Sequence, residues 1–405
     1  MILDYRHINK IEGNWILPAS KSLSHRYLIA QALSKVDFNL QNISESNDTS
    51  VLKENLALEE APFYSFKDAG TPSRLFIAYA SLTGLSGVID GNEELRNRPF
   101  SPLLKALQDL GAEFEYLEHE YSLPLKVKKT VNLLKNEVTI DNTFSSQYVS
   151  ALMMIAPYFK HGLTIHLENQ LTSISYIEMT KEVMKNCGIK VEFLNQKICV
   201  ENGNYKPPKN VFIESDWSAA SYPLMFAEVL NESNLFLPNL SLNSVQGDKV
   251  VSKFFKNIHF IEENHGLRII KSKTKQGQDN EYDLINCPDL FPTLLSTLVF
   301  KKVQCKLKGI QNLKFKESDR VGSMLFNLKE TVKVNVGENE LEINHNDYLD
   351  GVNIPLKINS FKDHRIAMAM SLFSLKYPIE IDDVEVVNKS FPRYWENLEK
   401  ALKRS

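Results

Sequence analysis

The sequence predicts an α/β protein with buried helices and strands outside them, and two observations predict this class. An amphipathic helix, a glycine and an alternating strand at 103–117 recur at 179–194. Looser copies follow at 250–264 and 323–336, so the unit returns every roughly 70–77 residues. Five further segments are apolar on nearly every helical face, at 73–84, 146–159, 220–230, 292–300 and 365–375. Such helices are buried, although ordinary helices packed on a sheet give the same pattern.

The two clearest repeats are each expected to end their helix at a glycine. Gly111 and Gly188 follow the last apolar turn of the repeat helix, where a left-handed residue commonly closes a helix. Apolar residues are spaced by three and four before each glycine and alternate with polar ones after it. This change of period predicts a helix followed by a half-buried strand.

Composition excludes several classes of protein. The 405 residues are 43% hydrophobic and 24% charged, which fits two or three globular domains. A formal charge of −3 predicts neither nucleic acid nor a membrane surface as a partner. Four scattered cysteines show no metal-ligand spacing, and the N-terminal segment lacks the apolar core of a signal peptide. A cytoplasmic protein that binds its ligands through local charge clusters is therefore expected.

Basic and hydroxylic residues gather where apolar helices are expected to begin. Backbone N–H groups and the helix dipole favour anions at such positions. The sets are Ser20, Lys21, Ser22, Ser24 and Arg26; Gly70, Thr71 and Arg74; and Ser145, Ser146 and Gln147. Ordinary N-capping explains each set equally well when it is taken alone.

The second half of the chain adds further charged residues next to apolar helices. They are Asp289; Lys316, Glu317, Asp319 and Arg320; Asp363, His364 and Arg365; and Lys389. Arg98 lies in a proline-rich turn of the first half. A pocket that gathered these cations would suit two phosphates and a carboxylate, provided that acids or ligands offset their mutual repulsion.

The motifs occur in the order SKSxSxR, AGTxxR, RP, SSQ, SxxYIxxT, PD, NxxxKESDR, DHRxAMA and KxFPxY, from Ser20 to Tyr394. In this order they resemble the 5-enolpyruvylshikimate-3-phosphate (EPSP) synthase family. The resemblance implies a two-lobed inside-out α/β barrel of six βαβαββ repeats, with helices inside and sheets outside. It also implies a shikimate-3-phosphate-binding lobe at 19–213. A second lobe, 1–18 plus 214–405, would complete the phosphoenolpyruvate and catalytic site in the cleft.

The family's reaction transfers the enolpyruvyl group of phosphoenolpyruvate to the 5-hydroxyl of shikimate 3-phosphate and releases phosphate. The resemblance implies no metal and no organic cofactor, and a monomer is expected. A tetrahedral adduct forms when the enol carbon gains a proton and the hydroxyl loses one, so one acid/base site and several fixed cations are needed. Inhibition by glyphosate is expected as well, because Gly70 keeps the small residue beside phosphoenolpyruvate.

The resemblance assigns a role to each matching residue. The catalytic residues would be Lys21, Asp289, Glu317 and His364. Shikimate 3-phosphate would be bound by Ser22, Arg26, Ser145, Ser146, Gln147, Ser173, Tyr176, Asp289, Asn312 and Lys316. Phosphoenolpyruvate would be bound by Lys21, Gly70, Arg98, Gln147, Arg320, Arg365 and Lys389.

The chain departs from the family pattern at three places. Lys67-Asp68 replaces the usual Gly-Asn, and Pro72 stands where a small residue is usual. The repeat in the 27–67 region is abbreviated, which predicts a smaller outer sheet without loss of chemistry. These departures leave open a non-catalytic anion-binding or regulatory relative. A UDP-amino-sugar enolpyruvyl transferase is a further alternative, although none of the four cysteines matches the reactive loop of that enzyme.

Overall fold

The computed structural model describes residues 1–34, 36, 38–58, 60–143, 145–169, 172–274, 277–344 and 355–402. The chain divides into two compact units. Unit 1 comprises Met1–Pro18 and Glu214–Ser405, and unit 2 comprises Ala19–Ile213. Each unit buries its own hydrophobic core. In the part of the chain that is described, no helix is long and apolar enough to cross a membrane.

Unit 2 contains seven α-helices and three open sheets within its described residues. The helices are α1 (Lys21–Ser34), α2 (Asn47–Leu56), α3 (Gly70–Thr83), α4 (Glu93–Arg96), α5 (Ser101–Asp109), α6 (Ser146–Ile155) and α7 (Ile174–Asn186). One sheet has the order β4 (Phe63–Ser65), β5 (Val88–Asp90), β7 (Leu125–Lys129), β6 (Glu113–Tyr116). A second has the order β10 (Val191–Leu194), β11 (Lys197–Val200), β9 (Leu163–Leu167), β8 (Glu137–Ile140). The third pairs only β12 (Asn210–Phe212) with β3 (Asn39–Gln41).

Unit 1 also contains three open sheets within the ranges described. Their orders are β14 (Ile258–Glu263), β15 (Gly266–Lys271), β13 (Glu232–Pro238), β2 (Lys10–Asn14); β16 (Glu281–Asp283), β17 (Cys305–Lys308), β19 (Glu340–Ile343), β18 (Asn335–Val336); and β1 (Ile2–Leu3), β21 (Ile379–Ile381), β20 (Leu356–Ile358). The helices are α8 (Trp217–Val229), α9 (Val251–Phe254), α10 (Phe291–Phe300), α11 (Arg320–Leu328), α12 (His364–Met370) and α13 (Tyr394–Leu402).

The four-stranded sheets share one topology. In each, two parallel strands are followed by an antiparallel hairpin, as in β4, β5, β6 and β7. Apart from the short helix α4, the elements of this sheet follow the order strand, helix, strand, helix, strand, strand in β4–α3–β5–α5–β6–β7. This arrangement confirms a mixed α/β fold. The expected barrel is not observed, because the described strands form separate open sheets instead of one closed sheet.

The sheet that contains β3, in the 27–67 region, has only two strands among the described residues. β3 pairs in parallel with β12, and no hairpin extends this pair among the described residues. Residues 35, 37 and 59 of this region lie outside the described part of the chain. Helix α2 is nevertheless present in full, with Ser46 accepting a hydrogen bond from Thr49 N as its N-cap. The region has therefore kept its helix while its sheet is small.

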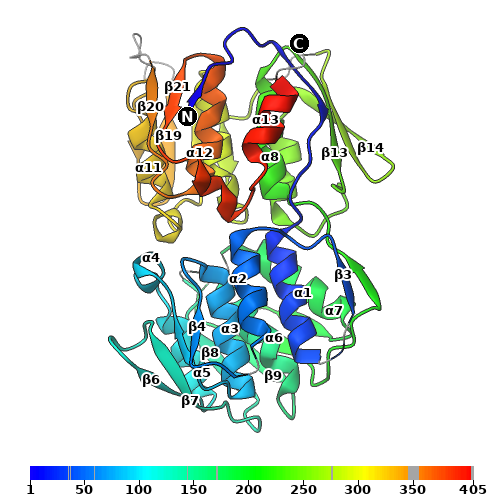
Figure 1. The fold of residues 1–405 in the computed structure, drawn as a ribbon, viewed down its shortest axis with the longest axis vertical. Helices are drawn as coiled ribbons and strands as arrows, with labels where there is room; N and C mark the ends of the chain where they lie inside the picture. Colours follow the sequence, from blue (N-terminus) through cyan, green and yellow to red (C-terminus); the bar gives the residue numbers. More distant parts are fainter. Residues whose placement is uncertain are drawn as a thin grey trace. The chain divides into compact units, whose positions relative to one another are not determined.

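The helices that the sequence marks as apolar are buried. In α6 every residue from Tyr148 to Ile155 is buried, and α3 and α10 are buried along most of their length. Strands such as β9 instead alternate buried and partly exposed residues. Helices α1, α2, α3 and α6 of unit 2 pack together (Figure 1). This pattern matches the prediction of helices that are hydrophobic nearly all round.

Local chemistry explains where individual helices end or begin. Gly111 and Gly188 have φ of +100° and +83°, as predicted for residues that close helices. After Gly111, Ala112 N donates to Leu107 O at 3.0 Å, which completes a Schellman motif. Pro72 lies in the first turn of α3, where an α-helix makes no use of the N–H that proline lacks.

Candidate active site

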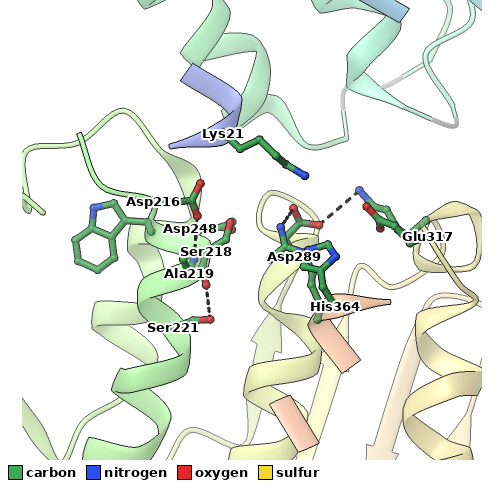
Figure 2. Close-up of polar contacts among 12 residues, drawn as sticks. Lys21, Asp216, Ser218, Ala219, Ser221, Asp248, Asp289, Glu317 and His364 are labelled. Atoms are coloured by element: carbon green, nitrogen blue, oxygen red, sulfur yellow. Dashed lines mark hydrogen bonds and ion pairs between the residues drawn. The ribbon is translucent and has the colours of Figure 1, made fainter. Parts of the chain in front are cut away.

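Three segments of unit 1 bring acidic and basic side chains together. They are the 3₁₀ turn Pro288–Leu290, the start of α11 and the start of α12. Arg320 Nη1 lies 2.7 Å from Asp289 Oδ1, and Arg365 Nη2 lies 2.6 Å from Asp289 Oδ2. Figure 2 shows Asp289 close to Glu317 and His364. Five predicted residues thus lie close together in unit 1, although 76 positions separate the first from the last: Asp289, Glu317, Arg320, His364 and Arg365.

Arg320 is held by three carboxylates at once. Besides Asp289 it contacts Glu317 through Nη2, and its Nε donates to Asp363 Oδ2 at 2.8 Å. The Arg320 side chain is only 1% exposed. A buried guanidinium needs such partners, because an unpaired charge in the interior is very costly.

Asp363 joins the two arginine-bearing helices into a closed ring of contacts. Its Oδ1 accepts from Arg365 N at 2.9 Å and thereby caps α12, while its Oδ2 binds Arg320. Since both arginines also bind Asp289, the ring runs from Asp363 through Arg320 and Asp289 to Arg365 and back. The ring fixes the direction of both guanidinium groups.

These charges shift the pKa values of the groups that they surround. Burial alone would raise the pKa of Asp289, but the charges of Arg365, Lys316 and Arg320 outweigh burial and hold it well below its usual range. Burial lowers the pKa of Lys316, and Asp289 opposes this shift. Burial would lower the pKa of Arg320 as well, yet Asp363 and the two other carboxylates raise it.

The remaining predicted residues of unit 1 lie at loop and helix boundaries. His364 is buried, with Nδ1 3.8 Å from Asp363 Oδ1. Lys316 Nζ lies 3.9 Å from Asp289 Oδ1. Lys389 is buried at the end of the 3₁₀ turn Glu385–Lys389, and Asn312 immediately precedes the turn Leu313–Phe315.

Sequence analysis missed Asp248, a buried carboxyl near the same cluster. Ser218 Oγ, in the first turn of α8, donates to it (Figure 2). Burial and the negative charge of Asp289 raise the pKa of Asp248 to about 7. Its only sequence signal is an acid that follows a glycine in Gln246-Gly247-Asp248, and that pattern is too common to single out a site.

In unit 2, Lys21 is the first residue of α1 and forms an ion pair with Asp48. Lys21 Nζ lies 2.8 Å from Asp48 Oδ2, and the side chains are 18% and 5% exposed. Lys21 was predicted at a helix start, whereas Asp48 was not predicted. The two residues lie 27 positions apart, on different helices.

Arg26 connects the first helix with the segment around Tyr176. It is 2% exposed and donates to Thr180 Oγ1 at 2.7 Å and to Ser150 Oγ at 3.1 Å. It also donates to the backbone oxygens of Ser22 and Tyr176 at 2.9 and 3.0 Å. In this structure Arg26 thus ties three predicted segments together.

Gln147 is held by a second arginine that the prediction did not assign to the site. Arg74 Nη1 donates to Gln147 Oε1 at 2.5 Å, and Arg74 Nη2 donates to Pro99 O at 3.1 Å. The Arg74 guanidinium also lies over the rings of Phe100 and Tyr148. The AGTxxR motif contains Arg74, so a signal was present, but its partner is 73 positions away.

Gly70 lies against two guanidinium groups. A Cβ at this position would be 2.7 Å from Arg98 Nη1 and 3.1 Å from Arg74 Nη1. Side chains larger than hydrogen would therefore displace the nearer guanidinium. Asp68, the acid that departs from the family pattern, is half-buried directly before Ala69, the N-cap of α3.

The predicted serines also lie at helix starts. Ser145 caps α6 and accepts from Gln147 N at 3.2 Å, and Ser146 is the first residue of that helix. Ser173 has φ of +56° and directly precedes α7, which contains Tyr176. Among the residues described, no group of three or more His, Cys, Asp or Glu side chains is placed to hold a metal ion.

Comparisons with known proteins show which family the chain is similar to. The model of the family EPSP synthase (3-phosphoshikimate 1-carboxyvinyltransferase) matches residues 51–398. A 3-phosphoshikimate 1-carboxyvinyltransferase of Bacteroides fragilis (strain YCH46) is 35% identical over 401 residues, which cover 97% of this chain and 96% of the relative. The enzyme of that name from Vibrio vulnificus (strain YJ016) is 30% identical over 429 residues, with 98% of each chain covered. A solved EPSP synthase from Acinetobacter baumannii has the same fold, with a TM-score of 0.76 at 20% identity over 99% of this chain and 97% of that chain.

Proposed function

The chain belongs to the EPSP synthase (3-phosphoshikimate 1-carboxyvinyltransferase) family, and from this premise we propose how its residues carry out the reaction. The enzyme transfers the enolpyruvyl group of phosphoenolpyruvate to the 5-hydroxyl of shikimate 3-phosphate and releases phosphate. The observation that carries the proposal is the ring of Asp289, Arg320, Asp363 and Arg365 in unit 1. It presents fixed cations beside a carboxylate, as transfer between two anionic substrates requires.

Asp289 is the base that accepts the proton of the 5-hydroxyl. While it binds Arg320 and Arg365, its low pKa makes it a weak base. When the phosphate and carboxylate of phosphoenolpyruvate take over these guanidinium groups, Asp289 loses two of the charges that stabilise its ionised form. Its basicity therefore rises once the second substrate is in place.

Lys21 and Glu317 manage the proton at the methylene carbon, with His364 assisting. One of them delivers a proton as the bond from the 5-oxygen to C2 of phosphoenolpyruvate forms, which gives the tetrahedral adduct. Removal of a proton from the resulting methyl group then expels phosphate and restores the double bond. Atoms balance across the two steps, and the same site serves as acid and then as base.

Binding of shikimate 3-phosphate is assigned mainly to unit 2. Its ligands there are Ser22, Arg26, Ser145, Ser146, Gln147, Ser173 and Tyr176, to which unit 1 adds Asp289, Asn312 and Lys316. Phosphoenolpyruvate is bound by Lys21, Gly70, Arg98 and Gln147 of unit 2 and by Arg320, Arg365 and Lys389 of unit 1. Hydroxyls and N–H groups at helix starts suit the 3-phosphate, because they add to the positive end of each helix dipole.

The sheets support an assignment of six βαβαββ repeats, three in each unit. Four repeats are complete, a fifth is formed around β20, α12 and β21, and the sixth consists of α1, β3 and α2 with β12. The sixth lacks the hairpin that ends the four complete repeats. In this assignment the buried helices lie inside and the sheets outside. The enzyme acts as a monomer in the cytoplasm.

The test is release of phosphate from phosphoenolpyruvate in the presence of shikimate 3-phosphate, measured in a coupled assay. We expect turnover that requires both substrates and that is lost when a UDP-amino sugar replaces shikimate 3-phosphate. Turnover with the UDP-amino sugar and phosphoenolpyruvate, but none with shikimate 3-phosphate, would instead identify a UDP-amino-sugar enolpyruvyl transferase. Binding of both substrates by calorimetry without any turnover would instead identify a non-catalytic relative.

A further inference from the structure

We propose that Asp48 is a positioning residue for Lys21, and that the shortened repeat has kept α2 because this helix supplies it. The proposal rests on the proposed function of Lys21. The Lys21 side chain leaves the first turn of α1 (Figure 2) and ends 2.8 Å from Asp48 Oδ2. Asp48 is 4% exposed, so its carboxylate has little freedom to move.

The start of α2 is fixed against α1 by contacts that do not involve this ion pair. His25 Nε2 lies 3.1 Å from Thr49 Oγ1, and Ser44 N donates to Ser24 Oγ at 3.0 Å. Ser46, the N-cap of α2, also contacts Thr49 Oγ1, at 2.9 Å. These polar contacts and the buried apolar residues hold the two helices together without Asp48.

The ion pair is therefore not needed to dock α2. Replacing a buried ion pair by neutral groups is often close to neutral for stability, and here the ammonium is partly exposed while the carboxylate is buried. A negative charge in the first turn of α2 is also favoured by the helix dipole. The pair accordingly serves to direct the ammonium more than to stabilise the fold.

Lysine needs such direction more than arginine does. Its ammonium sits on four methylene groups and has three equivalent donors. The bond to Asp48 fixes the position of the nitrogen. A displacement of about 1 Å at a reacting group can cost about 10²-fold in rate, so loss of this anchor should reduce turnover.

The shortened repeat supports this view. Its sheet consists of the single pair β3 and β12, yet α2 keeps its N-cap and its buried face. The sheet tolerates loss of its hairpin because none of the predicted site residues lies there. Loss of helix α2 would not be tolerated, because α2 carries Asp48.

A double-mutant cycle tests the proposal. Asp48→Asn is expected to lower kcat at least about tenfold in the wild-type background, because the nitrogen loses its anchor. In a Lys21→Met background the same change should alter the residual rate by less than about twofold. Thr49→Val, which changes the same turn of α2 and removes the contact with His25, serves as the matched control. It should lower the melting temperature and keep kcat within about twofold.

Acetylation of Lys21 by an N-hydroxysuccinimide ester, followed by mass spectrometry, gives a readout that does not depend on turnover. The ion pair with Asp48 holds the Lys21 amine, so Asp48→Asn should increase the rate at Lys21 at least about threefold, while Thr49→Val leaves it unchanged. Equal losses of kcat from Asp48→Asn in both backgrounds, or an unchanged acetylation rate, would overturn the positioning role. If the wild-type protein shows no turnover, the proposed function fails, and the acetylation result still decides whether Asp48 controls Lys21.

Discussion

Asp363 offers the sharpest test of how unit 1 is held together. Its carboxylate caps α12 through Arg365 N and binds the Nε of Arg320 at 2.8 Å. Asparagine keeps the shape of the side chain and an oxygen that can cap the helix, since Asn and Asp are equally good N-caps. Asp363→Asn therefore keeps the cap and removes the negative charge and the acceptor oxygen that face Arg320 Nε.

The structure sets the size of the effect. Breaking a buried ion pair costs about 3–5 kcal/mol when one charge is left without a partner. Arg320 is 1% exposed but keeps Asp289 and Glu317, so we expect about 2–3 kcal/mol for Asp363→Asn, below that full cost. Asp363→Ala also removes the cap and should cost about 1 kcal/mol more.

The tryptophans allow the change in the free energy of unfolding to be measured for unit 1 alone. All three, Trp15, Trp217 and Trp395, belong to that unit, so their fluorescence during urea denaturation reports its unfolding separately from unit 2. Asp319→Asn is the matched control, because Asp319 is an exposed N-cap next to Arg320 in sequence; it should change the free energy of unfolding by less than about 0.5 kcal/mol. A cost for Asp363→Asn as small as that of Asp319→Asn would refute the role of the ring.

Four further outcomes are expected. Glu317→Gln should lower kcat at least about 10²-fold in the phosphate-release assay, as for a lost acid/base group. Gly70→Ala, whose Cβ would lie 2.7 Å from Arg98 Nη1, should raise the KM for phosphoenolpyruvate about tenfold and change kcat less, in initial-rate measurements. Glyphosate should inhibit competitively with phosphoenolpyruvate, and non-competitive kinetics would contradict this. Burial, together with the charge of Asp289, raises the pKa of Asp248 to about 7. The ionised carboxylate therefore lowers the free energy of unfolding above pH 7, and this loss disappears as the pH falls toward the ordinary pKa of 3.8. Asp248→Asn should raise the urea midpoint of unit 1 at pH 8 and leave it nearly unchanged at pH 4.

The elements that the sequence predicted well are those set by local chemistry. Apolar runs predicted the positions of the buried helices, and hydroxyl or acidic residues before these runs predicted where the helices begin. Lys21, Gly70, Ser146, Arg320 and His364 are each the first residue of an α-helix. Capping preferences and hydrophobic period act within a few residues, so a single sequence carries them in full.

The partners of those residues were harder to predict, because they come from distant segments. Asp48 meets Lys21 across 27 positions and Arg74 meets Gln147 across 73. No periodicity or motif spacing in the sequence predicts either contact, because each depends on how two helices pack against each other. The abbreviated 27–67 region was expected to hold no residue of the site, yet Asp48, which contacts Lys21, lies within it.

The same packing changes how the cations should be understood. As a list, Lys316, Arg320 and Arg365 suggest an open positive pocket, but the structure pairs them with Asp289, Glu317 and Asp363. Three positive and three negative groups leave little net charge at this cluster. An anionic substrate must therefore displace an internal carboxylate instead of filling an empty site, so its affinity reflects an exchange of partners. Under the proposed function, the exchange that binds phosphoenolpyruvate also releases Asp289 from its arginines, and it thereby couples substrate binding to the basicity of Asp289.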